Sequence, residues 1–187
     1  AFLSGLEGIL YSSLTGTWTA FETLAADLWE AALNAHPDCL ANLNGGRAGR
    51  IGNEDGKHVL LKDIAKYRWN ISSKMGSVLK ERYNFSRLDG IRRAYEQAFS
   101  KQNQAILKII GSERFDELNI LRNVIVHNGG IVDNKYADLS SNFRGLPKWT
   151  EGEKIVVDGQ MVSLIITDVF TFGLSLVQEV DNWVSHN

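Results

Sequence analysis

The chain has 187 residues, of which 44% are hydrophobic and 22% charged, so its composition excludes global disorder and its length is enough for one domain with its own core. A single cysteine, Cys39, excludes a disulfide framework and a cysteine zinc site and fits a reducing, cytoplasmic setting. The formal net charge of −2 hides a basic middle: residues 1–46 sum to −5, residues 47–114 to +8 and residues 115–187 to −5. Such asymmetry permits a polyanion partner, although a solvated helix face is the commoner explanation of a basic segment.

The first predicted element is a helix that ends before Pro37. Thr19 and Glu22 have the spacing of a capping box, so we assign both to the start of this helix; contact of Glu22 with a functional site is the weaker alternative. Residues 2–14 are an earlier helix, or part of the same one interrupted at Gly16. The chain begins with neither Met nor a basic leader, so we expect a trimmed chain or a piece of a longer protein, without a signal peptide.

A glycine-rich segment follows at residues 42–57, with five glycines and then Lys57. Backbone amides in such a loop can surround a phosphate, which makes a nucleotide-binding phosphate loop the alternative to consider. Three residues separate Gly52 from the Gly56–Lys57 pair where that motif needs four, and His58 follows in place of Ser or Thr. We therefore predict a surface loop.

The rest of the chain is predicted to be mostly helical. One or two helices cover residues 58–83, another runs from Ser86 to Gly111, and a fourth opens at Ser112 and stops at Gly129. Asp158-Gly159, between two apolar runs, predicts the turn of a β-hairpin. A final helix, about residues 164–185, is expected to be a buried amphipathic helix and no membrane span. The predicted fold is thus mainly all-α, a single domain over 1–187: an up-and-down bundle of four to five helices with a small hairpin before the last.

Three polar residues interrupt the apolar helix that ends at Gly129: Arg122, Asn123 and His127. At about 100° per residue, Asn123 and His127 lie roughly 40° apart on one face, and Arg122 lies roughly 140° from His127 with a side chain long enough to curl toward it. A guanidinium binds phosphate through two parallel hydrogen bonds and stabilises developing charge, and an imidazole moves protons near neutral pH. The three residues therefore suit cleavage of a phosphodiester.

The segment RNVIVHNGG resembles the Arg-polar-x3-His motif of the HEPN domains, helical domains of bacterial toxins and phage-defence proteins. The resemblance implies a metal-independent endoribonuclease that cuts RNA by attack of a 2′-hydroxyl, in a cleft shared by two identical protomers. It implies that Arg122 binds the scissile phosphate, that His127 is the general acid or base, and that Asn123 assists. One subgroup has Tyr two positions after the His; this chain has Gly129 there, so the chemistry of that subgroup is not implied.

The expected partners are RNA, a second copy of the chain, and an antitoxin or partner domain; we expect no metal, no cofactor and no membrane contact. RNA contacts are assigned to five basic residues of the middle segment, namely Arg47, Arg50, Lys57, Arg92 and Arg93. The five tryptophans are expected in the core, with base stacking as the rarer alternative. Many HEPN relatives lack activity, so a non-catalytic dimerisation module that binds nucleotide or RNA and regulates a partner remains the second functional hypothesis.

Overall fold

The computed structural model describes residues 2–38, 60–99 and 103–186, and the side chains from residue 5 onward. The chain forms two compact units. Unit 1 comprises residues 1–22 and 111–174, and unit 2 comprises residues 23–110 and 175–187. Because two long helices, the first and the last, each cross from one unit to the other, neither unit is a continuous stretch of sequence, and each is described by itself below.

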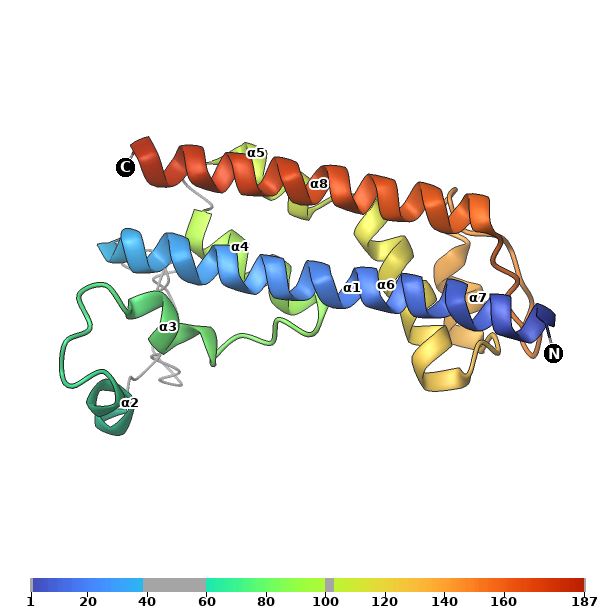
Figure 1. Cartoon of the computed structure of the whole chain (residues 1–187), viewed down its shortest axis with the longest axis horizontal. Helices are drawn as coiled ribbons and strands as arrows, with labels where there is room; N and C mark the ends of the chain where they lie inside the picture. The colour runs from blue at the N-terminus through green and yellow to red at the C-terminus, as the bar shows by residue number, and fades with distance from the viewer. Residues whose placement is uncertain (1, 39–59, 100–102, 187) are drawn as a thin grey trace, which may run out of the picture. The chain divides into compact units, whose positions relative to one another are not determined.

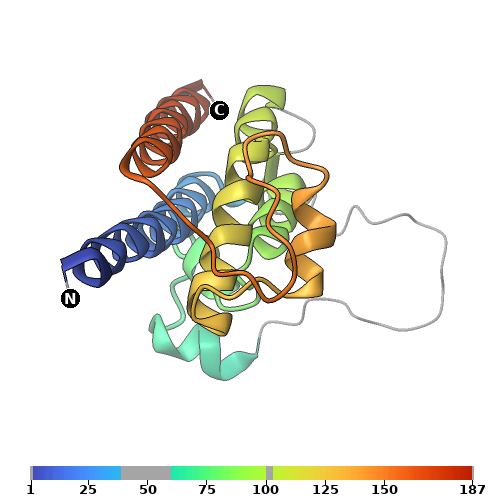
Figure 2. The ribbon, with the colours of Figure 1, turned by 90° about the vertical axis from the view of Figure 1, so that its right-hand side faces the viewer.

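Eight helices account for most of the described residues (Figures 1 and 2). Their bounds are α1 Phe2–Ala35, α2 Leu61–Lys66, α3 Met75–Lys80, α4 Leu88–Phe99, α5 Gln104–Ile110, α6 Glu113–Asn128, α7 Asn134–Ser140 and α8 Gly159–His186. The all-α class is confirmed. The predicted β-hairpin is not formed, and the described residues contain one isolated β-bridge, between Ile131 and Lys154.

α1 is one uninterrupted helix, so the capping box predicted at Thr19 is wrong. The Thr19 hydroxyl donates to the carbonyl of Thr15, 3.1 Å away and one turn earlier, as a hydroxyl does in the interior of a helix. Gly16 does not break α1, although a glycine inside a helix costs about 1 kcal/mol relative to alanine. The packing of Trp18 and Phe21, both buried on the same stretch of α1, offsets that cost.

The core of unit 1 joins α1 to α6 and α8. The ring of Phe21 stacks on the ring of Phe115 with centroids 4.0 Å apart, and Phe115 contacts Phe172 of α8 at 5.8 Å. Arg114 of α6 adds two ion pairs to this packing. Its Nη1 lies 2.6 Å from the buried Glu117 carboxylate, and its Nε lies 2.8 Å from the carboxylate of Asp168 on α8. These contacts anchor the first half of α6, and the candidate site lies on its second half.

Asp158 and Gly159 begin α8 instead of turning a hairpin. The Asp158 carboxylate accepts the backbone N–H of Met161 at 2.8 Å, which is the bond of a helix N-cap, and residues 160–164 continue as helix. The preceding run pairs upstream instead: the amide of Ile155 donates to the carbonyl of Gly130 at 2.8 Å, and the amide of Val132 donates to the carbonyl of Glu153 at 2.8 Å. The last helix thus starts five residues earlier than expected.

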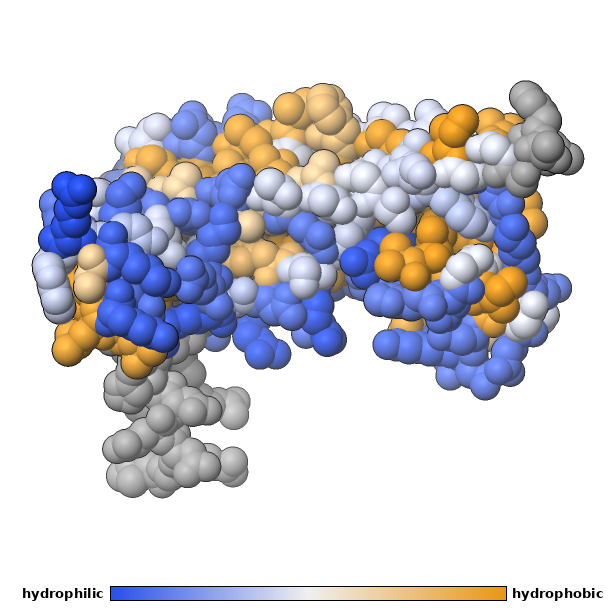
Figure 3. All heavy atoms as spheres, turned by 60° about the horizontal axis from the view of Figure 1, so that its bottom comes forward, coloured by the Kyte–Doolittle hydropathy of each residue, from blue (hydrophilic) through white to orange (hydrophobic). Residues whose placement is uncertain are grey.

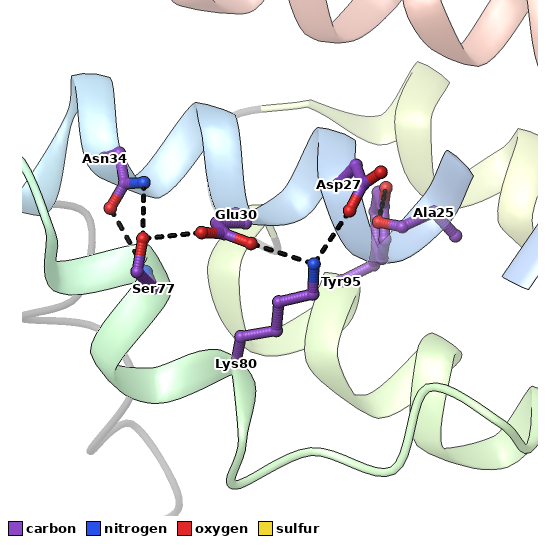
Figure 4. A network of polar contacts seen from close by, with 7 residues as sticks. All are labelled: Ala25, Asp27, Glu30, Asn34, Ser77, Lys80 and Tyr95. Atoms are coloured by element: carbon purple, nitrogen blue, oxygen red, sulfur yellow. Dashed lines mark hydrogen bonds and ion pairs between the residues drawn. The ribbon is translucent and has the colours of Figure 1, made fainter. Parts of the chain in front are cut away.

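Unit 2 packs the second half of α1 against α3 and α4. The indole of Trp29 donates to the carbonyl of Ala94 at 3.0 Å, and the hydroxyl of Tyr95 donates to the carbonyl of Ala25 at 2.8 Å. Lys80 of α3 lies 2.8 Å from the carboxylates of both Asp27 and Glu30, so acidic and basic segments neutralise each other here (Figure 4). These contacts fix three helices of unit 2 on one another.

The helix predicted from Ser86 to Gly111 is two helices in the structure. α4 is described to Phe99 and α5 begins at Gln104, where the side chain of Asn103 accepts the amide of Ala105 at 3.0 Å. An asparagine that caps a helix start in this way favours a new helix over continuation of the previous one. The two helices pack against each other.

The expectation of an amphipathic last helix agrees with α8, which buries an apolar stripe, although large apolar side chains also lie on its exposed side. Its exposed side chains include Leu164, Phe170 and Leu174. Among the described helices, α8 is the one long and apolar enough to cross a membrane by length and composition, with a window of mean hydropathy 1.7 of which 28% is buried. One such helix is weak support for a span, because core helices pass the same test.

Candidate functional site

α6 is set by signals at both of its ends, as the sequence predicted. The Ser112 hydroxyl accepts the amide of Arg114 at 3.4 Å at the first turn. Gly129 adopts φ 61°, a left-handed conformation that glycine takes at little cost, and the amide of Gly130 donates back to Val124 at 3.0 Å. The last helical turn, with His127, therefore has fixed limits and cannot extend further.

The turn after α6 is fixed from outside as well. The side chain of Asn128 donates to the carboxylate of Asp133 at 2.9 Å, and Asp133 also accepts the amide of Tyr136 as the N-cap of α7. Both bonds favour the ionised carboxylate and hold the pKa of Asp133 below its ordinary value. Asn128 thus holds the turn in place, beside the site but not within it.

The structure brings Arg122, Asn123 and His127 together. Nη1 of Arg122 donates to Oδ1 of Asn123 at 2.9 Å and lies 3.4 Å from Nε2 of His127. Because a guanidinium has no acceptor atom, a hydrogen bond between these two groups requires Nε2 as the acceptor. Arg122 does curl along the helix toward His127, as its length allowed.

The three side chains differ in their access to solvent. His127 is exposed, whereas Arg122 and Asn123 are half-buried. Asn119, one turn before Asn123, accepts a hydrogen bond from the Asn123 amide at 3.4 Å. An exposed imidazole next to a partly buried guanidinium presents a proton-transfer group and an anion-binding group to the same approaching molecule.

Glu22 of α1 belongs to the surroundings of Arg122. It accepts the indole N–H of the buried Trp18, and the charge of Arg122 acts on its carboxylate. Burial is the largest influence on this group and raises the pKa of Glu22, while the Trp18 bond and Arg122 lower it. The sequence favours a helix cap for Glu22 and gives a place beside the site as the weaker alternative; the structure supports the alternative, because the charge of Arg122 acts on this carboxylate.

Exposed apolar side chains adjoin the site. Val126 directly precedes His127 and 51% of it is exposed, and Ile131 follows the glycine turn and is also exposed. Neither residue can pack into unit 1 from its position, since the buried side of α6 is formed by Leu118, Leu121 and Val124. The end of α6 therefore combines charged, polar and apolar groups on accessible surface.

Of the five RNA-contact residues predicted in the middle segment, two belong to the described part of the chain. Arg47, Arg50 and Lys57 lie outside the described residues. Arg92 and Arg93 lie on α4, in unit 2, whereas Arg122 and His127 belong to unit 1. Arg92 is half-buried and its Nε donates to the carbonyl of Ile110 at 3.2 Å, so it also ties α4 to the end of α5.

Three of the five tryptophans, Trp18, Trp29 and Trp183, are in the core as expected, and Trp149 is half-buried beside Tyr136. Trp69 differs, with 65% of its side chain exposed. Within the described residues, no group of three or more His, Cys, Asp or Glu side chains is arranged to hold a metal ion.

Comparisons with known protein families, with curated proteins and with solved structures find no match to this chain.

Proposed function

We propose that this chain is a ribonuclease of the HEPN type, which cleaves RNA at the end of α6 without a metal ion. The observation that carries the proposal is the cluster in which the Arg122 guanidinium contacts both Asn123 and His127 at an accessible helix end. The resemblance to the HEPN motif implies a role for the same three residues.

In the proposed reaction, the Arg122 guanidinium binds the scissile phosphate and offsets the negative charge that builds up on its oxygens. A neutral His127 accepts the proton of the ribose 2′-hydroxyl through Nε2, and the 2′-oxygen attacks phosphorus. The bond from phosphorus to the 5′-oxygen breaks, and that oxygen receives a proton from a second acid. The products are a 2′,3′-cyclic phosphate and a 5′-hydroxyl, and no water is consumed in this step.

A second copy of the chain would supply the acid. Two α6 ends that face each other across a two-fold axis place two His127 side chains at one phosphodiester, one as base and the other, protonated, as acid. The exposed apolar side chains of Val126, inside the motif, and Ile131, directly after the glycine turn, support a homodimer through this end of α6.

RNA cleavage in the presence of a chelator tests the proposal. We expect the wild-type chain to produce cyclic-phosphate ends with EDTA present, and Arg122→Ala and His127→Ala each to reduce the rate at least a hundredfold. His186→Ala is the matched control, because His186 is also exposed in the last turn of a helix, and it should retain wild-type activity.

Two results would overturn the enzyme hypothesis. A folded, dimeric wild type that cuts no RNA under any condition, yet binds it, would favour the non-catalytic regulatory module. Cleavage that survives in both Arg122→Ala and His127→Ala would show that the activity arises elsewhere. Growth arrest on expression, relieved by His127→Ala, would in addition support a toxin-like or phage-defence role.

A further inference from the structure

Unit 2 contains a basic pocket on the segment that connects α2 to α3, separate from the Arg122–His127 site of unit 1. The pocket has a volume of about 470 Å³ and is lined by Lys66, Tyr67, Arg68, Asn70, Ser73 and Lys74. Three of these residues are cations, and the other three present hydroxyl or amide groups that can donate hydrogen bonds. No carboxylate is among them, so the lining suits an anion.

Nearby carboxylates neutralise only part of this charge. Lys66 lies 3.5 Å from Asp63 and 3.6 Å from Glu81. Among the described residues, Arg68 and Lys74 have no carboxylate within 4 Å. The charge of Lys74 acts on the Glu30 carboxylate from a greater distance, and that carboxylate lies 2.8 Å from Lys80. Arg68 and Lys74 are both exposed and so keep their charges available to a ligand.

An aromatic ring adjoins these cations. Trp69 follows Arg68 in the same turn, and both have positive φ angles, 66° and 52°, that side-chain-bearing residues seldom adopt. Trp69 is largely exposed, so its indole gains nothing from core burial in this conformation. Strongly hydrophilic residues gather over the α2–α3 end of unit 2 in Figure 3. Cations beside an exposed indole are the combination by which proteins bind single-stranded nucleic acid, with phosphates on the cations and bases stacked on the ring.

We infer that this pocket binds single-stranded RNA, with one backbone phosphate on Arg68, another on Lys74 and an adjacent base on Trp69. The inference rests on the proposed function in taking RNA as the ligand, but it assigns binding to residues that take no part in cleavage. The pocket volume is in the range of sites that hold a nucleotide-sized group.

Binding is measured by fluorescence anisotropy with a labelled oligouridylate of about twelve nucleotides, on the full chain with His127→Ala so that the RNA stays intact. Adding Arg68→Ala and Lys74→Ala together should weaken binding at least tenfold and lower the slope of log K against log salt by about 1.4, since two phosphate contacts are lost. Lys62→Ala with Lys108→Ala is the charge-matched control, because both lysines are exposed and outside the pocket, and it should change affinity less than threefold.

The stacking partner is tested separately: Trp69→Leu should lose about tenfold in affinity and Trp69→Phe should retain most of it. If the double variant does not fold, as judged by circular dichroism, Lys74→Ala alone serves as the test, with an expected slope change of about 0.7.

The inference is overturned if the pocket variant and the charge-matched control weaken binding equally, or if the His127→Ala chain binds no RNA at all. Uridine monophosphate and inorganic phosphate that bind as tightly as the oligonucleotide would also overturn it, in favour of a small-anion site. These results are independent of cleavage. If the wild-type protein cuts RNA and the pocket variants bind RNA normally, RNA binding by the pocket is refuted and the proposed function is not contradicted.

Discussion

Two arginines on α6 show how surroundings decide the role of a residue. Arg114 contacts the carboxylates of Glu117 at 2.6 Å and Asp168 at 2.8 Å, and these raise the pKa of Arg114 above its ordinary value. Arg122 contacts Asn123 and His127, and no carboxylate among the described residues lies within 4 Å of it. The charge of Arg114 therefore stabilises the fold through two ion pairs, while that of Arg122 remains available to bind an anion.

Glu22 should make stability depend on pH in a direction opposite to that of most carboxylates. Because burial raises its pKa, the folded chain holds the Glu22 proton more tightly than the unfolded chain does, and stability falls as pH rises through the two pKa values. Glu22→Gln keeps an oxygen for the indole of Trp18 and removes this titration. We expect the free energy of unfolding of the variant, relative to wild type, to increase between about pH 4 and pH 7 in urea denaturation.

The control for this prediction is Glu96→Gln, the same chemical change at an exposed position of α4. Its effect on unfolding should change little over the same pH range. A relative stability of Glu22→Gln that stayed flat would show that the Trp18 bond and Arg122 offset burial, and one that declined with pH would show that they outweigh it.

At the scale of elements, the sequence predicted those boundaries that local chemistry decides. Ser112 and Gly129 limit α6 through bonds within one or two turns, so both ends were readable from the chain alone. Asp158-Gly159 was misread because the same two residues suit a hairpin turn and a helix start: Asp accepts backbone amides in both. The packing of α8 decides in favour of the helix start, and this packing cannot be derived from a short stretch of sequence.

The same distinction holds for the site. Helical spacing placed Asn123 and His127 on one face, and side-chain length allowed Arg122 to join them, so the cluster was predictable from one helix. The neighbourhood of Arg122 and Glu22 was not, because it depends on the packing of Phe21 against Phe115, which are 94 positions apart in sequence and stack at 4.0 Å. Thr19 and Glu22 matched a capping box by spacing alone, and the continuity of α1 overrode it.

The N-cap of α8 gives a direct test of the corrected boundary. Asp158→Ala removes the acceptor for the Met161 amide, and we expect it to lower the free energy of unfolding by about 1 kcal/mol. Asp158→Asn keeps an acceptor oxygen and should lose much less. Urea denaturation of both variants measures the difference; if Asn and Ala are equally destabilising, charge at the helix start matters more than the hydrogen bond.

At the scale of the whole molecule, charge is partly paired within each unit. Lys80 contacts Asp27 and Glu30 in unit 2, and Lys154 contacts Glu7 at 2.7 Å in unit 1, so some of the acidic first segment is matched by later lysines. The basic excess of the middle segment that remains available includes Arg68 and Lys74. Net neutrality of the chain thus coexists with a basic pocket in one unit.

A homodimer through the end of α6 is the assembly that the proposed reaction requires, and Val126 is the residue that tests it. Val126→Glu places a charge on exposed apolar surface next to His127, where a two-fold interface would bury it unpaired. We expect light scattering at micromolar concentration to show a dimer for wild type and a monomer for Val126→Glu, with RNA cleavage lost in parallel.

Val177→Glu is the matched control, since Val177 is the same residue type, is 39% exposed and lies on α8 in unit 2, whereas the motif helix belongs to unit 1. It should leave both the dimer and the cleavage unchanged. A shared cleft also predicts that activity falls with dilution as the dimer dissociates, which a single-chain site does not predict. Each protomer contributes one His127 imidazole to the cleft, and the proposed reaction needs two. A Val126→Glu monomer that cuts RNA at the wild-type rate would therefore refute the shared cleft, and would leave His127 to act with another acid.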